Sequence, residues 1–337
     1  MNYSNDKKRI TKTAAVKKVI ACVLLVCMCF TLCSCSKESG KPEIKVPGKK
    51  EETLTAYSAR QMLALIRSQQ TKVTDVYTDQ IFTVLMDDQN KTYADTFLGI
   101  MKDYIIKLTT MADMADDRGI VLTESENDKI KKCAQDYVQK MESNENSVGL
   151  SVEEVEKLIS DQVKVKRLRK QIVDESDIEI SESEARVADL QRIIVDSTDD
   201  AARVMNEINE GGDFLMIARA NSIDAEIELK ASKIQLDPSM ADAVFALEDG
   251  EVSAILTCGD KYYIFRCEKG YDEEATSGMK EQIAEKRGNL AISSEYALYA
   301  ADHEHTIDDA DWTIAVRLFS SKAEADSIFD LLEETKL

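Results

Sequence analysis

Three residues near the C-terminal end of the chain carry side chains that bind metals and transfer protons. His303, Glu304 and His305 are consecutive, and they include the only two histidines among 337 residues. Zinc sites take three or four imidazole, thiolate or carboxylate ligands, so a metal here would need ligands from elsewhere in the chain. A metal site is the alternative; we expect a solvated acidic link, with no metal and no cofactor.

A second group of chemistry-bearing residues is a basic cluster in an acidic chain. Five of the seven positions from 164 to 170 are basic: Lys164, Lys166, Arg167, Arg169 and Lys170. Such a run usually forms a solvated helix face. Contact with an anionic cell envelope, or with the protein's own acidic surface, stays open. No Walker or Rossmann glycine-rich loop and no Gly-x-Ser-x-Gly motif occurs in the sequence, so neither nucleotide binding nor serine hydrolysis is indicated.

The first 34 residues predict a signal peptide. Six basic residues between Lys7 and Lys18 precede an apolar run from Val19 to Leu32. The run is shorter than the about 20 residues that a transmembrane helix needs, and it suits the apolar region of a signal peptide. It ends in Leu-Cys-Ser-Cys, which resembles the bacterial lipobox. Cys35 is therefore expected to be lipidated and to anchor the mature chain to the cell membrane on its extracytoplasmic side.

Cleavage before Cys35 would remove four of the eight cysteines, and lipid would occupy a fifth. Cys133, Cys258 and Cys267 would remain, an odd and scattered set that indicates no disulfide framework. If Gly259-Asp260 is a two-residue turn, Cys258 faces Lys261 and the two nearby thiols are not apposed.

The charge of the chain argues against nucleic acid as a partner. The whole sequence carries a net charge of −20. Residues 1–34 hold six basic residues and one acidic residue, so the remainder is at −20 − 5 = −25. Phosphate backbones need Lys and Arg partners, and this charge also repels the protein body from anionic lipid. Membrane attachment would therefore rest on the lipid anchor.

The elements from Leu190 to Glu268 predict a small α+β domain. A strand-like run at 192–195 leads into a helix that ends at Gly211-Gly212, and a second helix starts at Asp213-Phe214. A short helical piece from Met240 to Leu247 precedes two predicted strands, 252–256 and 262–266, joined at Gly259-Asp260.

This segment resembles the parvulin family of peptidyl-prolyl isomerases. The resemblance rests on Arg-Ile-Ile-Val at 192–195, Gly-Gly-Asp-Phe at 211–214, Ser-Ile-Asp at 222–224, Phe-Ala-Leu at 245–247 with Gly-Glu-Val-Ser at 250–253, and Tyr-Ile-Phe at 263–265. Parvulins hold a proline in an apolar pocket beside a hydrogen-bonded group of two His, a Cys or Asp, and hydroxyls. The resemblance implies no cofactor.

The resemblance assigns site residues position by position. Asp224 matches the acidic or thiol position, Leu236 and Met240 match the apolar lining of the proline pocket, and Phe245 matches the aromatic residue beneath it. Two departures matter: Arg192 and Tyr263 stand where the family has histidines. The resemblance implies Asp224, Tyr263 and Arg192 as catalytic residues and the other three as substrate-binding residues. Arg cannot accept a hydrogen bond as neutral His can, so we expect an Arg192–Asp224 ion pair.

The flanks are predicted to be helical. Apolar spacing from Tyr57 predicts helices, the longest of them from about Tyr93 to Arg118 with a stop at Gly119. Capping-box spelling predicts helix starts at Thr123, Ser151 and Ser181. The methionines are predicted to lie in an ordinary core, with an adaptable binding groove as the alternative: Met101, Met111, Met114 and Met141.

After residue 270 the pattern predicts a helix from about Glu273 to Tyr299, a strand at 312–316 and a last helix. The flanks resemble the corresponding parts of PrsA-type foldases and SurA-type chaperones, which implies that helices before and after the parvulin-like domain pack into one unit.

The predicted fold class is α+β, a mainly helical PrsA/SurA-like unit with an inserted parvulin-like domain. The expected division is 1–34 signal peptide, 35–55 tether, 56–188 helical domain, 189–270 parvulin-like domain and 271–337 a segment that packs back on the helical domain. The expected function is that of a lipid-anchored foldase with isomerase activity, acting on unfolded or newly exported polypeptides. The alternative is a chaperone whose altered domain only binds unfolded chains. A homodimer stays open.

Overall fold

The computed structural model of the chain describes residues 57–337 except 87–89, 145–146, 304, 320–327 and 336. The predicted signal peptide, the lipid attachment at Cys35 and the tether lie outside the described residues. Within the described part, no helix combines the length and the apolar character that crossing a bilayer requires.

The chain divides into two compact units. The first, here called the helical unit, comprises the described residues up to Ser176 together with Asn289–Leu337. The second, the sheet unit, comprises Asp177–Gly288 and so falls between the two segments of the helical unit in sequence. A mainly helical chain with a small antiparallel sheet confirms the predicted α+β class. The sheet unit is wider at both ends than the predicted 189–270.

The helices of the helical unit begin where the sequence supplies caps. Thr123 and Ser151 each accept a hydrogen bond from the backbone N–H three residues on, and the carboxylate of the Glu at that position accepts one from the N–H of the cap residue. Thr92 and Asp95 form the same arrangement. Gly119 has φ +73°, as a helix stop requires. The elements are α2 (Ala59–Val76), the 3₁₀ helix η1 (Asp79–Thr83), α3 (Tyr93–Asp117), α4 (Glu124–Met141), α5 (Val152–Glu175), the C-terminal part of α10 (Glu273–His303), α11 (Asp309–Phe319) and α12 (Ile328–Thr335).

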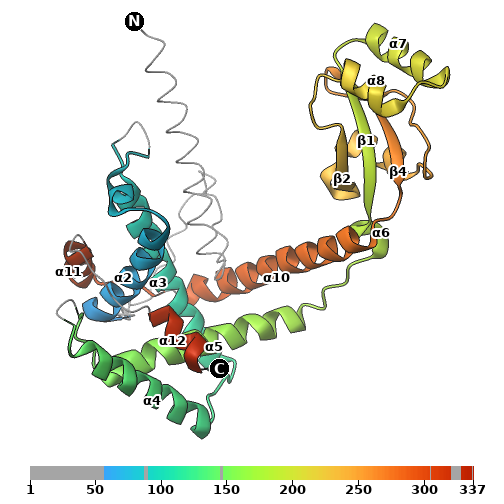
Figure 1. Cartoon of the computed structure of the whole chain (residues 1–337). Coiled ribbons are helices and arrows are strands. Elements are labelled where there is room, and N and C mark those ends of the chain that lie inside the picture. The colour runs from blue at the N-terminus through green and yellow to red at the C-terminus, as the bar shows by residue number, and fades with distance from the viewer. Residues whose placement is uncertain (1–56, 87–89, 145–146, 304, 320–327, 336) are drawn as a thin grey trace, which may run out of the picture. The chain divides into compact units, whose positions relative to one another are not determined.

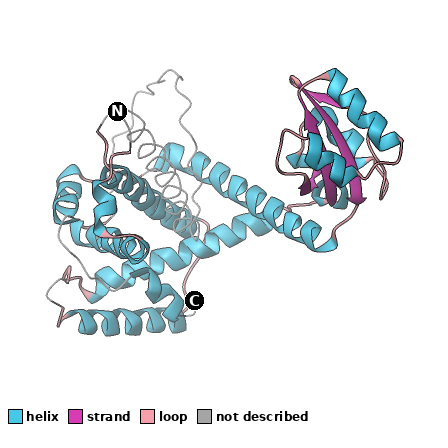
Figure 2. Ribbon diagram, turned by 45° about the horizontal axis from the view of Figure 1, so that its top comes forward, coloured by secondary structure: helices cyan, strands magenta, loops and turns pink. Residues whose placement is uncertain are grey.

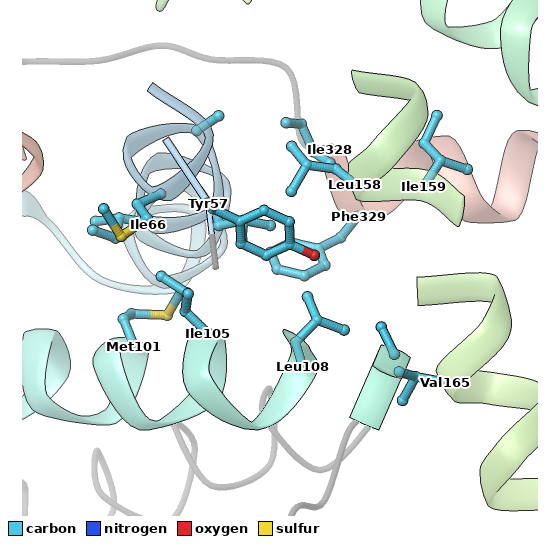
Figure 3. Packing of buried hydrophobic residues seen from close by; sticks show 14 of the residues in the cluster. Tyr57, Ile66, Met101, Ile105, Leu108, Leu158, Ile159, Val165, Ile328 and Phe329 are labelled. Atoms are coloured by element: carbon cyan, nitrogen blue, oxygen red, sulfur yellow. The ribbon is translucent and has the colours of Figure 1, made fainter. Parts of the chain in front are cut away.

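The core of the helical unit joins segments far apart in the sequence. Figure 3 shows side chains from α2, α3, α5 and α12 gathered around the ring of Tyr57. The Tyr57 hydroxyl donates to Asp161 at 2.8 Å, and burial raises the pKa of this phenol. The four methionines named above are all buried in this core, so the prediction of an ordinary core is confirmed.

The predicted strand at 312–316 is wrong, because these residues belong to α11. The Asp308 carboxylate accepts from the N–H groups of Ala310 and Asp311 and starts the helix. Ala315 and Phe319, four residues apart, are both buried. The Phe319 ring lies 5.2 Å from that of Phe82 and 5.6 Å from that of Phe97. Packing along a helical face therefore outweighs the strand propensity of the β-branched residues.

The basic cluster on α5 binds the protein's own groups. Lys164 pairs with Asp116 of α3 at 2.6 Å, and Arg167 pairs with Glu126 of α4. Arg169 donates to Asn289 at 3.3 Å, and Lys166 donates to the carbonyl of Leu337 at 2.7 Å. Lys170 pairs within α5, with Asp174. The cluster therefore ties α5 to its neighbours, and the interpretation as a purely solvated face is wrong.

The two histidines lie in different surroundings. His303 is exposed on α10, where its ring stacks on Tyr299. His305 is 7% exposed: its Nε2 contacts the Asp113 carboxylate, and its backbone N–H donates to Thr110 at 3.1 Å. Glu304 lies outside the described residues. The expectation of a solvated link is wrong for His305.

The sheet unit is built on four antiparallel strands in the order β2-β1-β4-β3 (Figure 1). They are β1 (Val187–Val195), β2 (Glu228–Ser232), β3 (Leu256–Cys258) and β4 (Lys261–Lys269). The helices are α6 (Glu182–Ala185), α7 (Thr198–Asn209), α8 (Phe214–Asn221), the 3₁₀ helix η2 (Lys233–Gln235), α9 (Pro238–Phe245) and the first part of α10. Figure 2 shows the strands with helices packed around them.

The two faces of the sheet carry separate apolar clusters. One face packs on α7 and α8 through Ile193, Val204, Phe214 and Ile264. The other carries Leu190 and Phe265 and packs on α9. Alternation along β1 and β4 produces this division, because successive side chains point to opposite faces.

The closing hairpin is partly as predicted. Gly259, with φ +63°, and Asp260 form the turn, and Cys258 pairs with Lys261. The predicted strand at 252–256 is wrong except at its end: β3 begins at Leu256, and Val252 makes only an isolated bridge with Arg266. Among the described residues, Cys133, Cys258 and Cys267 form no disulfide.

Candidate functional site

The candidate site lies on the face of the sheet that packs on α9. Arg192 of β1 is directly opposite Phe265 of β4, so their side chains share this face. Tyr263 lies two residues before Phe265 and therefore on the same face. The rings of Tyr263 and Phe265 stack with centroids 6.3 Å apart and planes 9° apart. The sheet thus places the two substituted histidine positions next to each other.

Asp224 is held by the loop that follows α8. The N–H of Ile223 donates to the Ile194 carbonyl at 2.9 Å, which fixes the loop to the end of β1. The Ser222 hydroxyl accepts from the N–H groups of Ile194 and Asp224 at 3.2 and 3.3 Å. One oxygen of Asp224 then accepts from the Glu226 N–H at 3.0 Å, which closes a short turn.

The other oxygen of Asp224 meets Arg192. The Arg192 Nη2 lies 2.8 Å from Asp224 Oδ2, so the ion pair expected from the sequence is present. The same nitrogen lies 3.3 Å from the carboxylate and 3.3 Å from the carbonyl oxygen of Glu226. The Arg192 side chain is only 15% exposed, whereas those of Asp224 and Glu226 are 41% and 68% exposed. The guanidinium is therefore held in place from its solvent side.

The apolar part of the site surrounds α9. Met240 is buried, and the half-buried side chains of Leu236, Phe245 and Tyr263 pack against the same cluster. Asp237 starts α9, since its carboxylate accepts from the Ser239 N–H at 2.9 Å. Leu236, Met240, Phe245 and Tyr263 thus belong to one apolar cluster, and Arg192, paired with Asp224, shares a face of the sheet with it.

The structure adds two residues that sequence reasoning missed. Glu226 is the second carboxylate on Arg192; its only signal in the sequence is its place two residues after Asp224. Arg186 lies 5.6 Å from the centre of the Phe245 ring and donates to the Phe245 carbonyl at 3.3 Å. It also donates to the Gly270 carbonyl at 2.5 Å. Arg186 therefore holds Phe245 in position, and no spacing in the sequence indicates this contact.

The cysteines near the site are poorly suited to nucleophilic chemistry. Burial and a hydrogen bond to Asp237 raise the pKa of the Cys258 thiol. Burial also raises the pKa of Cys267. Because the thiolate is the reactive form, both groups stay protonated at neutral pH.

This arrangement can bind an apolar ring beside a polarised amide. Leu236, Met240 and Phe245 supply apolar surface. The Arg192 guanidinium and the Tyr263 hydroxyl are hydrogen-bond donors on the same face of the sheet. An amide group next to a bound ring would therefore meet donors rather than a nucleophile, and such a site favours conformational change over bond cleavage.

Comparison with known proteins identifies the domain. Residues 178–277 match the family model of the PPIC-type PPIase domain. The recognition of a parvulin-type domain in this segment from the sequence is therefore confirmed.

Two foldases resemble the chain at the level of sequence. The chain is 34% identical over 106 residues to the foldase protein PrsA of Streptococcus sanguinis (strain SK36), with 29% of this chain and 32% of that protein covered. It is 34% identical over 113 residues to the foldase protein PrsA of Enterococcus faecalis (strain ATCC 700802 / V583), with 28% and 33% covered. The matched segment thus spans about a third of the length of these relatives.

Solved structures of such proteins are more distant. The peptidylprolyl isomerase PrsA of Bacillus cereus has a TM-score of 0.35 at 15% identity, with 75% of this chain and 98% of that chain covered. PrsA of Bacillus subtilis has a TM-score of 0.26 at 17% identity, with 76% and 99% covered. At these scores the likeness carries no conclusion about arrangement or function.

Proposed function

We propose that the chain is a membrane-anchored extracytoplasmic foldase that assists exported polypeptides and isomerises prolyl peptide bonds slowly. One observation supports the proposal: in a segment that matches the PPIC-type domain, the ion-paired Arg192 and Tyr263 share a face of the sheet with the apolar cluster of Leu236, Met240 and Phe245. The PrsA foldases that resemble it support the same role.

In this proposal the proline ring packs on Leu236, Met240 and Phe245. Arg192 and Tyr263 donate to the amide, and Asp224 and Glu226 hold the guanidinium. The uncatalysed bond has a barrier of about 18–20 kcal/mol, and each tenfold acceleration needs about 1.4 kcal/mol of preference for the twisted amide. Apolar contact binds the planar and twisted forms nearly equally, so it accelerates little by itself.

Arg192 and Tyr263 do not provide the same hydrogen-bonding groups as two histidines. A neutral imidazole both donates and accepts, whereas a guanidinium only donates. We therefore expect an isomerase rate far below that of parvulins with both histidines, together with effective suppression of aggregation. The chain from residue 36 onward is the sample for both assays.

The assays separate the candidates. A slow isomerase rate that falls further in Asp224→Ala supports the proposal. Aggregation suppression with no isomerase rate above background would leave only the chaperone alternative. Vigorous isomerisation by the unmodified protein, abolished by Asp224→Ala, would show that this assignment of the site is wrong.

The proposed anchor is tested separately. Mass analysis of the protein taken from membranes should find an acylated Cys35 at its N-terminus, and Cys35→Ser should release the protein from the membrane. Cys33→Ser, two residues away, is the matched control and should leave the anchoring unchanged. An intact, unacylated N-terminus on the membrane form would refute the anchor.

A further inference from the structure

The charged groups around Arg192 carry a net negative charge. Its Nη2 serves two carboxylates, Asp224 at 2.8 Å and Glu226 at 3.3 Å. One guanidinium carries a single positive charge, so the group as a whole carries −1. The negative charges also lie toward solvent, because Glu226 is 68% exposed and Arg192 only 15%. A ligand approaching this face meets carboxylate oxygens first.

The charges elsewhere around the site are closer to balance. Lys233 of η2 pairs with Asp242 of α9. At the hairpin end, Cys258 has the acidic Asp237 as a hydrogen-bond partner and the basic Lys261 as its neighbour across the strands, so one residue of each sign adjoins it. Among the described residues at this site, the excess negative charge therefore lies at the Arg192 end.

Exposed apolar surface accompanies that charge. Ile223, directly before Asp224, is 50% exposed. Lys and Arg side chains bury an apolar stem and keep a charged head in water. The exposed Ile223 can contact the apolar stem of a Lys or Arg side chain, and the nearby carboxylate can pair with its charged head. Acidic side chains would be repelled, and small apolar ones would use only Ile223.

We propose that the site prefers prolyl segments with Lys or Arg next to the proline, and that Glu226 is the residue that determines this specificity. This inference rests on the proposed function, namely that this face of the sheet unit binds prolyl peptides. Asp224 holds Arg192 in place, and Glu226 supplies the charge that selects the substrate. The substrate class is thus a cationic prolyl segment of an unfolded chain.

The test measures binding of three labelled peptides that differ only in the residue before proline, which is Lys, Gln or Glu. The chain from residue 36 onward is titrated at low salt. A partly exposed ion pair leads us to expect about two- to fivefold tighter binding of the Lys peptide than of the Gln peptide, and the weakest binding for the Glu peptide. About 1 M salt should remove the differences.

A variant assigns the effect to its residue. In Glu226→Gln the ratio of the dissociation constants of the Gln and Lys peptides, measured within the variant, should fall to about one, so that the preference for Lys is lost. Glu228→Gln is the matched control, because Glu228 pairs with Gln191 on the opposite face of the sheet; it should keep the preference.

Each contrary result has its own meaning. Equal binding of all three peptides by the unmodified chain would overturn the inference while prolyl binding stands. A preference that survives Glu226→Gln would overturn the assignment to Glu226. Failure of all three peptides to bind would instead count against the proposed function.

Discussion

Arg192 limits what the candidate site can do to an amide bond. Its guanidinium is fixed by Asp224 and Glu226, so it is positioned as a donor but cannot accept a proton or a hydrogen bond. Tyr263 adds a hydroxyl from the neighbouring strand. Both residues stand at positions where the parvulin resemblance has histidines, and strands β1 and β4 bring them to one face of the sheet.

Placing imidazoles at these two positions should therefore raise the rate of prolyl isomerisation. We expect the double variant Arg192→His, Tyr263→His to isomerise a prolyl peptide faster than the unmodified chain, with similar affinity for that peptide. The rate is measured by exchange spectroscopy at equilibrium. The single variant Arg192→Lys is the control, because it keeps a donor of the same charge and gains no acceptor. A double variant no faster than this control would show that the backbone does not hold the parvulin geometry.

A second residue-scale feature links α4 to α5. Arg167 and the N–H and side chain of Thr123 lower the pKa of Glu126 to about 2, with Arg167 the largest cause. In the unfolded chain this carboxyl has its ordinary pKa of about 4.5. The unfolded state therefore binds more protons between these values, so stability rises with pH across that window.

This linkage predicts a pH-dependent effect of one substitution. Glu126→Gln should lower the urea midpoint of unfolding at pH 7, and the difference from the unmodified chain should shrink from about pH 4.5 down to about pH 2. The matched control is Glu124→Gln, which changes an acid in the first turn of the same helix. A midpoint difference that is constant from pH 7 to pH 2 would contradict the assignment to the Arg167 contact.

At the scale of elements, α11 shows how packing determines local structure. Phe319 is 7% exposed among aromatic rings from η1 and α3, whereas its neighbour Leu318 is 45% exposed. We expect Phe319→Ala to lower the free energy of unfolding by about 3 kcal/mol, the usual cost of removing a buried aromatic side chain. Leu318→Ala should cost less than about 1 kcal/mol. Denaturant unfolding measures both, and equal losses would contradict the packing described for α11.

The structure of α11 could not be predicted from the sequence. Thr313, Ile314 and Val316 have strand propensity, and contact with α2 and its neighbours, together with the Asp308 cap, makes the segment helical. Helix starts at Thr123 and Ser151 were predictable because capping is local chemistry. At Ser181 only one of the two hydrogen bonds of a capping box is present: the Ser181 hydroxyl accepts from the Glu184 N–H, whereas the Glu184 carboxylate binds Arg287. That partner lies about a hundred residues away.

The candidate site likewise has features that could be predicted from the sequence and features that could not. The Arg192–Asp224 pair followed from the resemblance and simple electrostatics. Strand β2 was missed because Glu228 and Lys230 give it a polar spelling; its apolar side chains are Leu229 and Ala231. Glu226 and Arg186 were missed because their roles depend on a turn and on a contact across the domain.

At the scale of the whole molecule, the two ends of the parvulin-like segment of the sheet unit lie side by side. The N–H of Asp272 donates to the carbonyl of Val187 at 2.9 Å. A short Gly-Ser bridge can therefore replace residues 186–272 without stretching the chain. We expect this deletion to leave a helical protein that unfolds cooperatively, as measured by circular dichroism during thermal unfolding. A gradual, non-cooperative transition would show that the remaining helices need the deleted residues.

The discontinuous core of the helical unit also has a consequence for the order of folding. Ala59–Val76 packs against Asp309–Phe319 and Ile328–Thr335, so the first described helix meets these two partners only after some 250 further residues have been made. The sheet unit is contiguous and can fold as soon as it emerges. When the chain is made from its N-terminus, the sheet unit should therefore be complete while the helices that precede it still lack their C-terminal partners.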